Sequence, residues 1–323
     1  MMKAIALISG GLDSILAAKL ISGLGIDIIG LKFKTSFYAR PGKTQDSYGI
    51  EIKEIDISQQ FLSIVLNPRY GYGSNINPCI DCKIFMLNKA RELMPGFHAE
   101  FVVTGEVLGQ RPMSQNRQNL DLVEKKSGLE GFLLRPLSAK LLKETTPEKE
   151  RWVDRQQLLA LSGRSRREQI KLAKDFGIKE YPQPAGGCLL TNPDFSEKIQ
   201  KLINFGELNL EHVELLKMGR FFRLSEKARL IVGRNKEENE GLTKSMKKED
   251  YLFMPQDIMG PAALGRGDFN NALIRLSCSI VCRYCDLDGK KETEVIYQRP
   301  YEGKEAVLKV EPLDEVSLAG FKI

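Results

Sequence analysis

The sequence of 323 residues lacks any apolar stretch near the roughly 18 residues that a membrane-spanning helix needs. Its first apolar run, Ala4 to Ile8, is too short for the hydrophobic region of a signal peptide, and two glycines follow it closely. There is no internal repeat and no low-complexity tract. These absences predict a globular cytoplasmic protein without a membrane partner, and the length predicts two or three domains.

Histidine is scarce, because His98 and His212 are the only two. Neither lies near a cysteine motif, so the fourth ligand that a closed zinc site needs is missing there. The six cysteines are Cys79, Cys82, Cys188, Cys278, Cys282 and Cys285. Cysteines this closely spaced in a cytoplasmic protein favour metal or sulfur chemistry over structural disulfides.

The net charge is +6, from 48 Lys and Arg against 42 Asp and Glu, and it is unevenly placed. Between Arg135 and Glu180 there are 12 basic and 7 acidic residues, including the run RSRR at 164–167. This basic segment is either a solvated helix face or a surface for a polyanion such as a nucleic acid.

Buried strands alternate with helical patterns in the first half of the chain. Strands are expected at 3–8, 27–33, 51–57 and 101–104, and helices at 14–24 and 84–94, the second closed by Pro95 and Gly96. This alternation predicts an α/β fold with a doubly wound parallel sheet, whose functional edge lies at the carboxyl ends of the strands.

The second half of the chain changes character twice. Residues 140–181 are expected to be mostly helical, with a helix start at Thr146-Pro147-Glu148. After about residue 215 the pattern becomes short strands and turns. We therefore predict one domain over 1–214, which includes the basic helical segment, and a smaller α+β domain over 215–323.

Residues 9–14 read SGGLDS and separate the first expected strand from the first expected helix. Glycines allow close backbone approach, and the free N–H groups of a helix N-terminus attract an anion. No GK[ST] follows, so this is not the Walker-type loop. Asp13 is unusual beside a phosphate unless it binds Mg²⁺ or orders the loop. The segment predicts a phosphate site, although two glycines before a helix are also common turn chemistry.

The hexapeptide resembles the SGGxDS loop of the PP-loop ATP pyrophosphatases, which bind the departing pyrophosphate of ATP. The resemblance implies cleavage of ATP between the α and β phosphates and transfer of AMP to a carbonyl oxygen. Some members of this family use the step for amidation, and others use it to insert sulfur into tRNA.

The segment NPCIDCKIFML, residues 77–87, resembles the NPCxxC segment of tRNA thiouridine synthetases. Cys188 follows in PAGGCLLT, residues 184–191. Cys79, Cys82 and Cys188 together resemble the iron–sulfur thiolation enzymes, in which three thiolates on a [4Fe–4S] cluster leave one iron open for a sulfide. The alternative is persulfide chemistry, in which one cysteine carries the sulfur and another resolves it. All three are expected to be catalytic and to be the cluster ligands.

Cys278, Cys282 and Cys285 have the CxxxCxxC spacing of radical SAM enzymes. They fall, however, in an apolar run, LIRLSCSIVCRYC, that predicts a helix with all three on one face. Packing of small apolar side chains and a second metal site are the two interpretations.

Three further stretches extend the resemblance. TGE at 104–106 and GQRPMSQ at 109–115 resemble 4-thiouridine synthases, and RPL at 135–137 with GRSRREQ at 163–169 resembles one branch of them. GRFFRL at 219–224 and IVGRN at 231–235 resemble the RNA-binding module of the NFACT proteins. The residues that this implies for ATP are Ser9, Gly10, Gly11, Leu12, Asp13, Ser14, Phe33, Gly105 and Arg111.

The RNA-binding region that usually precedes the PP-loop in 4-thiouridine synthases is not evident, nor is a rhodanese-like domain. RNA binding is therefore expected through the basic segment and the C-terminal module. The candidate residues are Arg164, Arg166, Arg167, Arg220, Arg223 and Arg234.

The sequence thus predicts an ATP-dependent tRNA sulfurtransferase that uses ATP, Mg²⁺ and a [4Fe–4S] cluster, with Asp13 also catalytic. Its expected partners are tRNA and a sulfur donor, either a cysteine desulfurase persulfide or inorganic sulfide, and a second copy in a homodimer. Two alternatives remain open: an amide-forming enzyme acting on a small molecule, and an RNA- or ribosome-associated binding protein.

Overall fold

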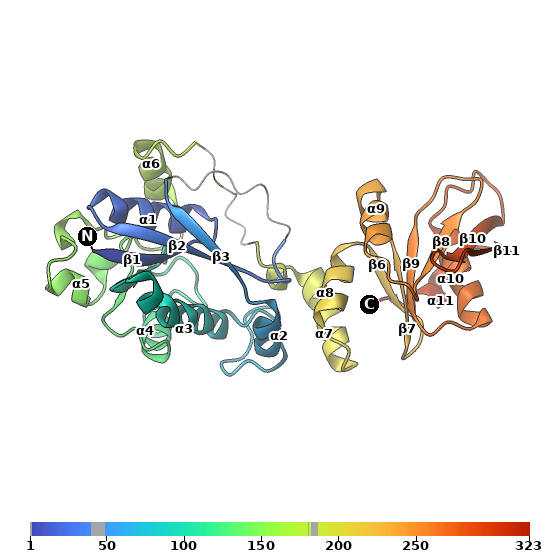
Figure 1. The fold of residues 1–323 in the computed structure, drawn as a ribbon, viewed down its shortest axis with the longest axis horizontal. Helices are drawn as coiled ribbons and strands as arrows, with labels where there is room; N and C mark the ends of the chain where they lie inside the picture. Colours follow the sequence, from blue (N-terminus) through green and yellow to red (C-terminus); the bar gives the residue numbers. More distant parts are fainter. Residues whose placement is uncertain (1, 40–48, 180, 182–186) are drawn as a thin grey trace. The chain divides into compact units, whose positions relative to one another are not determined.

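The computed structural model describes residues 2–39, 49–179, 181 and 187–323. The chain forms two compact units, Met1–Ser196 and Glu197–Ile323, each with its own sheet (Figure 1). Over the described residues, no helix has the length and apolar character needed to cross a membrane.

The first unit is built on five parallel strands in the order β3-β2-β1-β4-β5. The strands are β1 (Lys3–Leu7), β2 (Asp27–Lys34), β3 (Glu51–Asp56), β4 (Phe101–Val103) and β5 (Leu133–Leu134). The first four are the strands expected from the sequence. The predicted doubly wound parallel α/β fold is therefore confirmed.

Helices cover both faces of this sheet (Figure 1). They are α1 (Leu12–Gly23), α2 (Ser58–Leu66), α3 (Cys79–Phe97), α4 (Arg117–Lys126), α5 (Thr146–Lys149) and α6 (Arg167–Asp175). Successive side chains of a strand point to opposite faces, so Ala4 and Ala6 pack with α1 and α6. Ile5, between them, packs with α3 and α4. Nearly continuous apolar strands are what a sheet buried on both faces requires.

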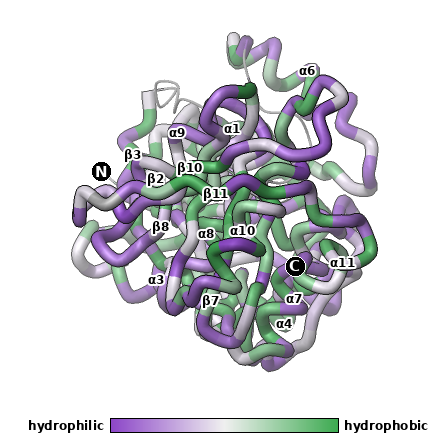
Figure 2. The backbone as a smooth tube through the Cα atoms, turned by 90° about the vertical axis from the view of Figure 1, so that its right-hand side faces the viewer, coloured by the Kyte–Doolittle hydropathy of each residue, from purple (hydrophilic) through white to green (hydrophobic). Residues whose placement is uncertain are grey.

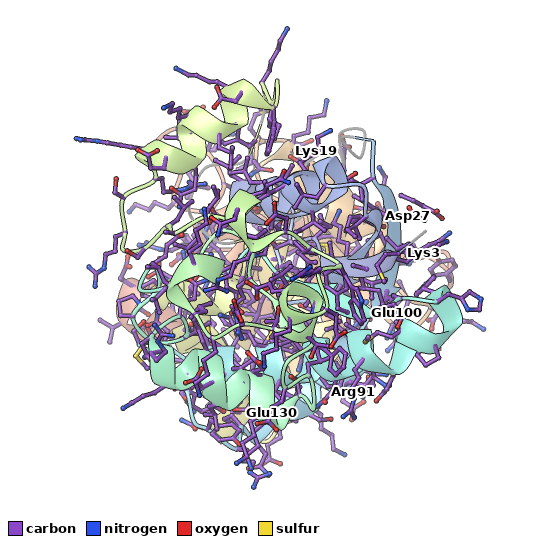
Figure 3. The ribbon with its side chains drawn as sticks, turned by 90° about the vertical axis from the view of Figure 1, so that its left-hand side faces the viewer. Lys3, Lys19, Asp27, Arg91, Glu100 and Glu130 are labelled. Carbon is purple, nitrogen blue, oxygen red and sulfur yellow. The ribbon has the colours of Figure 1, made fainter. Side chains whose placement is uncertain are left out.

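The amino ends of the strands form one edge of the sheet, which carries ordinary surface charges. Lys3 and Asp27, opposite each other on β1 and β2, form a salt bridge of 3.2 Å (Figure 3). The N–H of Glu100 donates to the carbonyl of Lys3 at 2.9 Å. The loops after β1 and β4, which hold the candidate site, lie at the opposite edge.

Helix α3 is longer than the expected span of 84–94. It begins at Cys79, directly after Pro78, and runs through Pro95 to Phe97, so both predicted ends were wrong. A proline in the last turn removes only one hydrogen bond. The helix ends instead at His98, whose φ of 51° is left-handed and lets the N–H of Ala99 bond to the Met94 carbonyl at 3.0 Å.

The prediction that 140–181 is mostly helical was wrong. Over the described residues of this range the structure has only short helical pieces, in chain order a 3₁₀ turn at Ala139–Leu141, α5, a 3₁₀ turn at Arg155–Gln157, and α6. The start of α5 at Thr146-Pro147-Glu148 is confirmed, because Thr145 and Glu148 form a reciprocal capping box. Beyond it, Leu159 and Leu161 donate their N–H groups to Pro136 and Leu137, so tertiary backbone pairing replaces the helix.

The second unit contains a six-stranded antiparallel sheet in the order β11-β10-β8-β9-β7-β6. Its strands are β6 (Arg220–Arg223), β7 (Ala228–Val232), β8 (Tyr251–Pro255), β9 (Ala263–Gly267), β10 (Thr293–Arg299) and β11 (Lys304–Val310). Its helices are α7 (Pro193–Asn204), which crosses the unit boundary, α8 (Leu210–Lys217), α9 (Lys236–Lys244), α10 (Asn271–Arg283) and α11 (Glu315–Ala319). This confirms the expected α+β architecture.

Most of α7 and all of α8 group with the second unit, although the boundary was expected at 214 and 215. Glu207, between these helices, pairs with Arg223 of β6 at 2.8 Å and contacts Arg229 of β7. The ring of His212 on α8 packs edge-on against Phe221 at 5.6 Å. These contacts attach the segment to the antiparallel sheet.

Helix α10 contains both apolar and polar residues (Figure 2), and it buries its apolar face in the second core. Cys278 and Cys282 are fully buried there. The thiol of Cys282 donates to the Val310 carbonyl at 3.5 Å, and that of Cys285 to the Val281 carbonyl at 3.3 Å. These contacts favour the packing interpretation of the C-terminal cysteines.

A buried ion cluster joins the elements around β4. Arg135, after β5, donates to Glu106 at 2.9 Å and to Glu124 of α4 at 2.7 Å, and Lys83 of α3 contacts the other oxygen of Glu106. Burial alone would raise the pKa of Glu106, but the charges of Lys83 and Arg135 outweigh it and lower the pKa to about 2. Glu106 is therefore ionised and tightly held.

Replacing Arg135 with methionine should lower the free energy of unfolding by about 3–5 kcal/mol, because the buried Glu106 would keep only Lys83 and the half-buried Glu124 would lose its guanidinium partner. Urea unfolding at neutral pH measures the change. Lys126→Met, an exposed position on α4, is the control and should stay within about 0.5 kcal/mol of the parent protein. A similar small effect for Arg135→Met would contradict the cluster.

Candidate active site

The SGGLDS loop leaves the carboxyl end of β1 and enters α1 at Leu12. Gly10 has a φ of +79°, a conformation that residues with a side chain rarely adopt. The hydroxyl of Ser14 donates to the Gly11 carbonyl at 2.7 Å, and the N–H of Gly11 donates to the Ser9 hydroxyl at 3.3 Å. Helix α1 has no side-chain cap among the described residues. Its first N–H groups therefore suit an anion such as a phosphate.

Gly105, after β4, lies against the start of α1. A Cβ added at Gly105 would lie 2.4 Å from the carbonyl atoms of Asp13 and from the nitrogen of Ser14. Only glycine permits this approach, so the predicted ATP residues of the first loop and Gly105 come together at one edge of the sheet.

The carboxylate of Asp13 has two unlike environments. Its Oδ2 accepts a hydrogen bond of 2.8 Å from the side-chain amide of Gln110. Its Oδ1 is buried and has no hydrogen-bond partner among the described residues. A buried carboxylate oxygen without a donor costs free energy, so it suits a hard cation such as Mg²⁺.

The three cysteines expected to act together come from two distant segments. Cys79 and Cys82 occupy the first turn of α3, and Cys188 forms an isolated β-bridge with Tyr38. Burial raises the pKa of Cys82, and the nearby sulfurs of Cys188 and Cys79 raise it further. Burial also raises the pKa of Cys188 to about 11, with a further contribution from Cys79. The three sulfurs therefore lie close enough to repel one another as thiolates.

The donor set suits a metal, yet its geometry is open. Over the ranges that the structure describes, no three His, Cys, Asp or Glu side chains are grouped closely enough to hold a metal ion. A cluster of several irons separates its cysteine ligands more widely than a single ion does, and thiolate is the ligand that such clusters use. Of the PAGGCLLT segment, residues 184–186 lie outside the described residues.

Asn77 and Tyr38 were not singled out from the sequence. The buried amide of Asn77 donates to the sulfur of Cys79 at 3.1 Å. Burial raises the pKa of Tyr38, and the three neighbouring cysteines raise it further. Asn77 lies two residues before Cys79 in the NPC motif, which was a usable signal, whereas only the fold brings Tyr38 to Cys188.

Two expected ATP residues lie elsewhere than the loop. The side chain of Phe33 is buried in the core on the α3 side of the sheet. Arg111 is exposed, and its charge acts on Cys188 and Tyr38. The structure thus brings Arg111 to the cysteines.

The expected RNA-binding arginines divide between the two units. Arg164 and Arg167 are exposed and Arg166 is half-buried, all at the start of α6. In the second unit the guanidinium groups have internal partners. Arg220 stacks on Tyr284 at 4.3 Å, Arg223 pairs with Glu207, and Arg234 pairs with Glu238 at 2.7 Å.

Comparison with family models gives one match for each unit. Residues 1–145 match the family described as thiamine biosynthesis protein (ThiI), and residues 219–321 match the NFACT protein RNA binding domain. These are the two families that the sequence motifs resembled.

Two curated proteins are similar to the first part of the chain. A tRNA-specific 2-thiouridylase MnmA of Petrotoga mobilis is 29% identical over 130 residues, which cover 33% of this chain and 35% of that protein. A probable tRNA sulfurtransferase of Thermococcus kodakarensis is 31% identical over 142 residues, which cover 42% and 36%. The chain thus spans about a third of the length of these relatives.

Among solved structures, a 4-thiouridine synthetase–RNA complex with bound ATP has a TM-score of 0.40 and 19% identity. The alignment covers 67% of this chain and 53% of that one.

Replacing Gly105 with alanine should destabilise the protein by roughly 1–3 kcal/mol, because the new methyl group overlaps the backbone of Asp13. Thermal or urea unfolding measures the effect. Gly96→Ala is the matched control: this exposed position in α3 has open space around its Cβ, so alanine there should stabilise by roughly 0.5–1 kcal/mol. Equal effects at the two glycines would contradict the close approach.

The raised pKa of Cys188 predicts a steep pH dependence of its reactivity in reduced, metal-free protein. Only the thiolate reacts with iodoacetamide, so the alkylation rate should rise about tenfold per pH unit from pH 7 to 9. Peptide mass spectrometry after timed labelling measures this rate at Cys188. A rate that is flat over this range would mean that the thiolate is already formed at neutral pH.

Proposed function

We propose that this chain, which joins a ThiI-type domain to an NFACT-type RNA-binding domain, is an ATP-dependent tRNA sulfurtransferase. The observation that carries the proposal is a continuous set of contacts from the nucleotide loop to the cysteines. Asp13 touches Gly105, Glu106 contacts Lys83, and Lys83 follows Cys82 in the first turns of α3. A nucleotide loop and a cysteine cluster at one edge of the sheet suit a two-step reaction. ATP first activates a carbonyl oxygen of uridine, and sulfur then replaces that oxygen.

In the first step a ring carbonyl oxygen of uridine attacks the α phosphorus of ATP. The bond between that phosphorus and the bridging oxygen breaks, and pyrophosphate leaves. The N–H groups at the start of α1 would bind the pyrophosphate, and their dipole offsets its growing charge. The uridine oxygen is now bound to AMP and has become a good leaving group.

In the second step sulfur attacks the activated ring carbon, and AMP leaves with the original oxygen. By the persulfide route, the outer sulfur of a cysteine persulfide attacks the activated ring carbon. The thiolate of a second cysteine then attacks the inner sulfur and breaks its bond to the transferred sulfur. This leaves a disulfide that a thiol reductant must reduce. Asn77 would hold the Cys79 sulfur in a fixed position for either route.

Two groups would complete the site. The unpartnered Oδ1 of Asp13 would hold Mg²⁺, which neutralises phosphate charge. Cys79, Cys82 and Cys188 would hold a [4Fe–4S] cluster, whose open iron supplies sulfide chemistry when it is bound. The raised pKa values of Cys82 and Cys188 support a cationic partner, because like charges of buried thiolates are costly without one. A desulfurase persulfide or inorganic sulfide would supply the sulfur.

The tRNA would bind through backbone electrostatics to the exposed Arg164 and Arg167 and through the second unit. The internal pairs of Arg223 and Arg234 reduce the charge that these two side chains present to RNA. We therefore assign the larger electrostatic share to the basic residues at the start of α6.

Deleting the gene in the source organism should remove one thiolated uridine from its tRNA. A wild-type copy should restore the nucleoside and an Asp13→Ala copy should not, because the cation and the loop would lose their carboxylate. Mass spectrometry of digested tRNA measures the nucleosides. Asp27→Ala, at the opposite edge of the sheet, is the control and should restore it. An unchanged nucleoside profile on deletion would contradict the proposal.

A further inference from the structure

The position of the Asp13 carboxylate depends on a side chain from another loop. The amide nitrogen of Gln110 donates to Asp13 Oδ2 at 2.8 Å. Since the other oxygen of this carboxylate has no partner among the described residues, Gln110 is what fixes its orientation there. Gln110 is only partly buried and would otherwise be free to turn its amide toward water.

A second glutamine orients the first. Gln169 on α6 is 1% exposed, and its amide nitrogen donates to the side-chain oxygen of Gln110 at 3.4 Å. A buried amide needs hydrogen-bond partners, and Gln110 supplies one. The bond also fixes which end of the Gln110 amide faces Asp13, because the accepting oxygen must point to Gln169 and the donating nitrogen to Asp13.

Backbone hydrogen bonds also link the loop that carries Gln110 to the residues before α6, in addition to the bond between the two glutamines. Leu108 and Ser162 form a parallel bridge, and the N–H of Gly163 donates to the Leu108 carbonyl at 2.8 Å. Ser138 accepts from the N–H of Leu108 at 3.0 Å and donates to the Leu161 carbonyl at 2.7 Å. The loop that carries Gln110 therefore rests on the residues that directly precede the basic run.

The basic run at 164–167 and Gln169 belong to one short segment. Arg164 and Arg167 are exposed to solvent, and Gln169 lies just beyond them on the buried side of α6. Helix α6 packs on α1, the helix that begins with the candidate phosphate loop. A ligand that binds Arg164 and Arg167 thus contacts the start of the same helix that orients Gln110.

We propose that Gln169 and Gln110 are positioning residues that make the orientation of Asp13 depend on RNA bound at Arg164–Arg167. The inference rests on the proposed function for the identity of the ligands. RNA that binds best to one position of α6 stabilises that position. The hydrogen bonds from Gln169 to Gln110 and from Gln110 to Asp13 then stabilise the matching orientation of the Asp13 carboxylate. The enzyme then cleaves ATP efficiently only when its RNA is in place.

The test compares Gln110→Ala, Gln169→Met and the double variant in pyrophosphate release with and without tRNA. Each single change should reduce the tRNA-stimulated rate roughly 10- to 100-fold, because Asp13 loses its fixed position. The dissociation constant for tRNA should stay within about twofold of the parent value, because both changes leave the exposed Arg164 and Arg167 in place. The double variant should be no slower than Gln110→Ala, since both changes break one chain.

Gln118→Ala, an exposed glutamine on α4, is the matched control and should keep the full stimulated rate. Methionine at 169 keeps the volume of the buried side chain, and thermal unfolding verifies that each variant is folded. An unchanged tRNA-stimulated rate in Gln169→Met would overturn the coupling through Gln169 and Gln110. A loss of rate that weaker tRNA binding fully explains would also overturn it. So would a double variant whose loss of rate equals the product of the two single losses.

A second readout separates this inference from the proposed function. Calorimetric titration of ATP at several Mg²⁺ concentrations, without tRNA, reports on the candidate nucleotide site in the absence of RNA. Gln110→Ala should weaken the Mg²⁺ dependence of ATP affinity several-fold, Gln169→Met should do so in the same direction, and Gln118→Ala should not. If the parent protein releases no pyrophosphate with tRNA, the sulfurtransferase proposal fails. The titration then tests by itself whether Gln110 and Gln169 position Asp13. An unchanged Mg²⁺ dependence in both variants would overturn this role.

Discussion

The carboxylate of Glu106 is the contact on which the candidate site depends. It lies at the carboxyl edge of the sheet and binds Lys83 and Arg135, which come from α3 and from the end of β5. Because it is buried with both cations, its charge cannot be removed without leaving them unpaired. The residue before it, Gly105, touches the phosphate loop, and Lys83 follows Cys82. One buried ion cluster thus links the SGGLDS loop to the helix turn that carries Cys79 and Cys82.

How far the sequence could predict this arrangement depends on the range of the interactions involved. Four strands and the phosphate loop were predictable because periodicity and the SGGLDS motif are local signals. The helical assignment of 140–181 failed because Leu159 and Leu161 pair with the backbone of Pro136 and Leu137, 23 and 24 residues earlier, which no local pattern reveals. Tyr38 escaped notice for the same reason, since its partner Cys188 is remote in sequence. Gln110 belongs to the GQRPMSQ stretch that carried the resemblance, but its hydrogen bond to the distant Asp13 could not be predicted from the sequence.

The two units place charge and sulfur differently. In the second unit, Arg223 and Arg234 pair with carboxylates and Cys278 and Cys282 fill the core, so motif residues there also support the fold. In the first unit, Arg164 and Arg167 face solvent while Cys79, Cys82 and Cys188 gather near Tyr38. The same residue types therefore differ in chemical availability according to their burial and partners.

The separation of the three clustered cysteines along the chain has a consequence for biosynthesis. Cys188 is made more than a hundred residues after Cys79, which at about 5–20 residues per second is a delay of roughly 5–20 s on the ribosome. Through that interval Cys79 and Cys82 are present without Cys188. Assembly of the cluster proposed above would therefore have to follow synthesis of nearly the whole first unit, and the two early thiols would have to stay reduced until then.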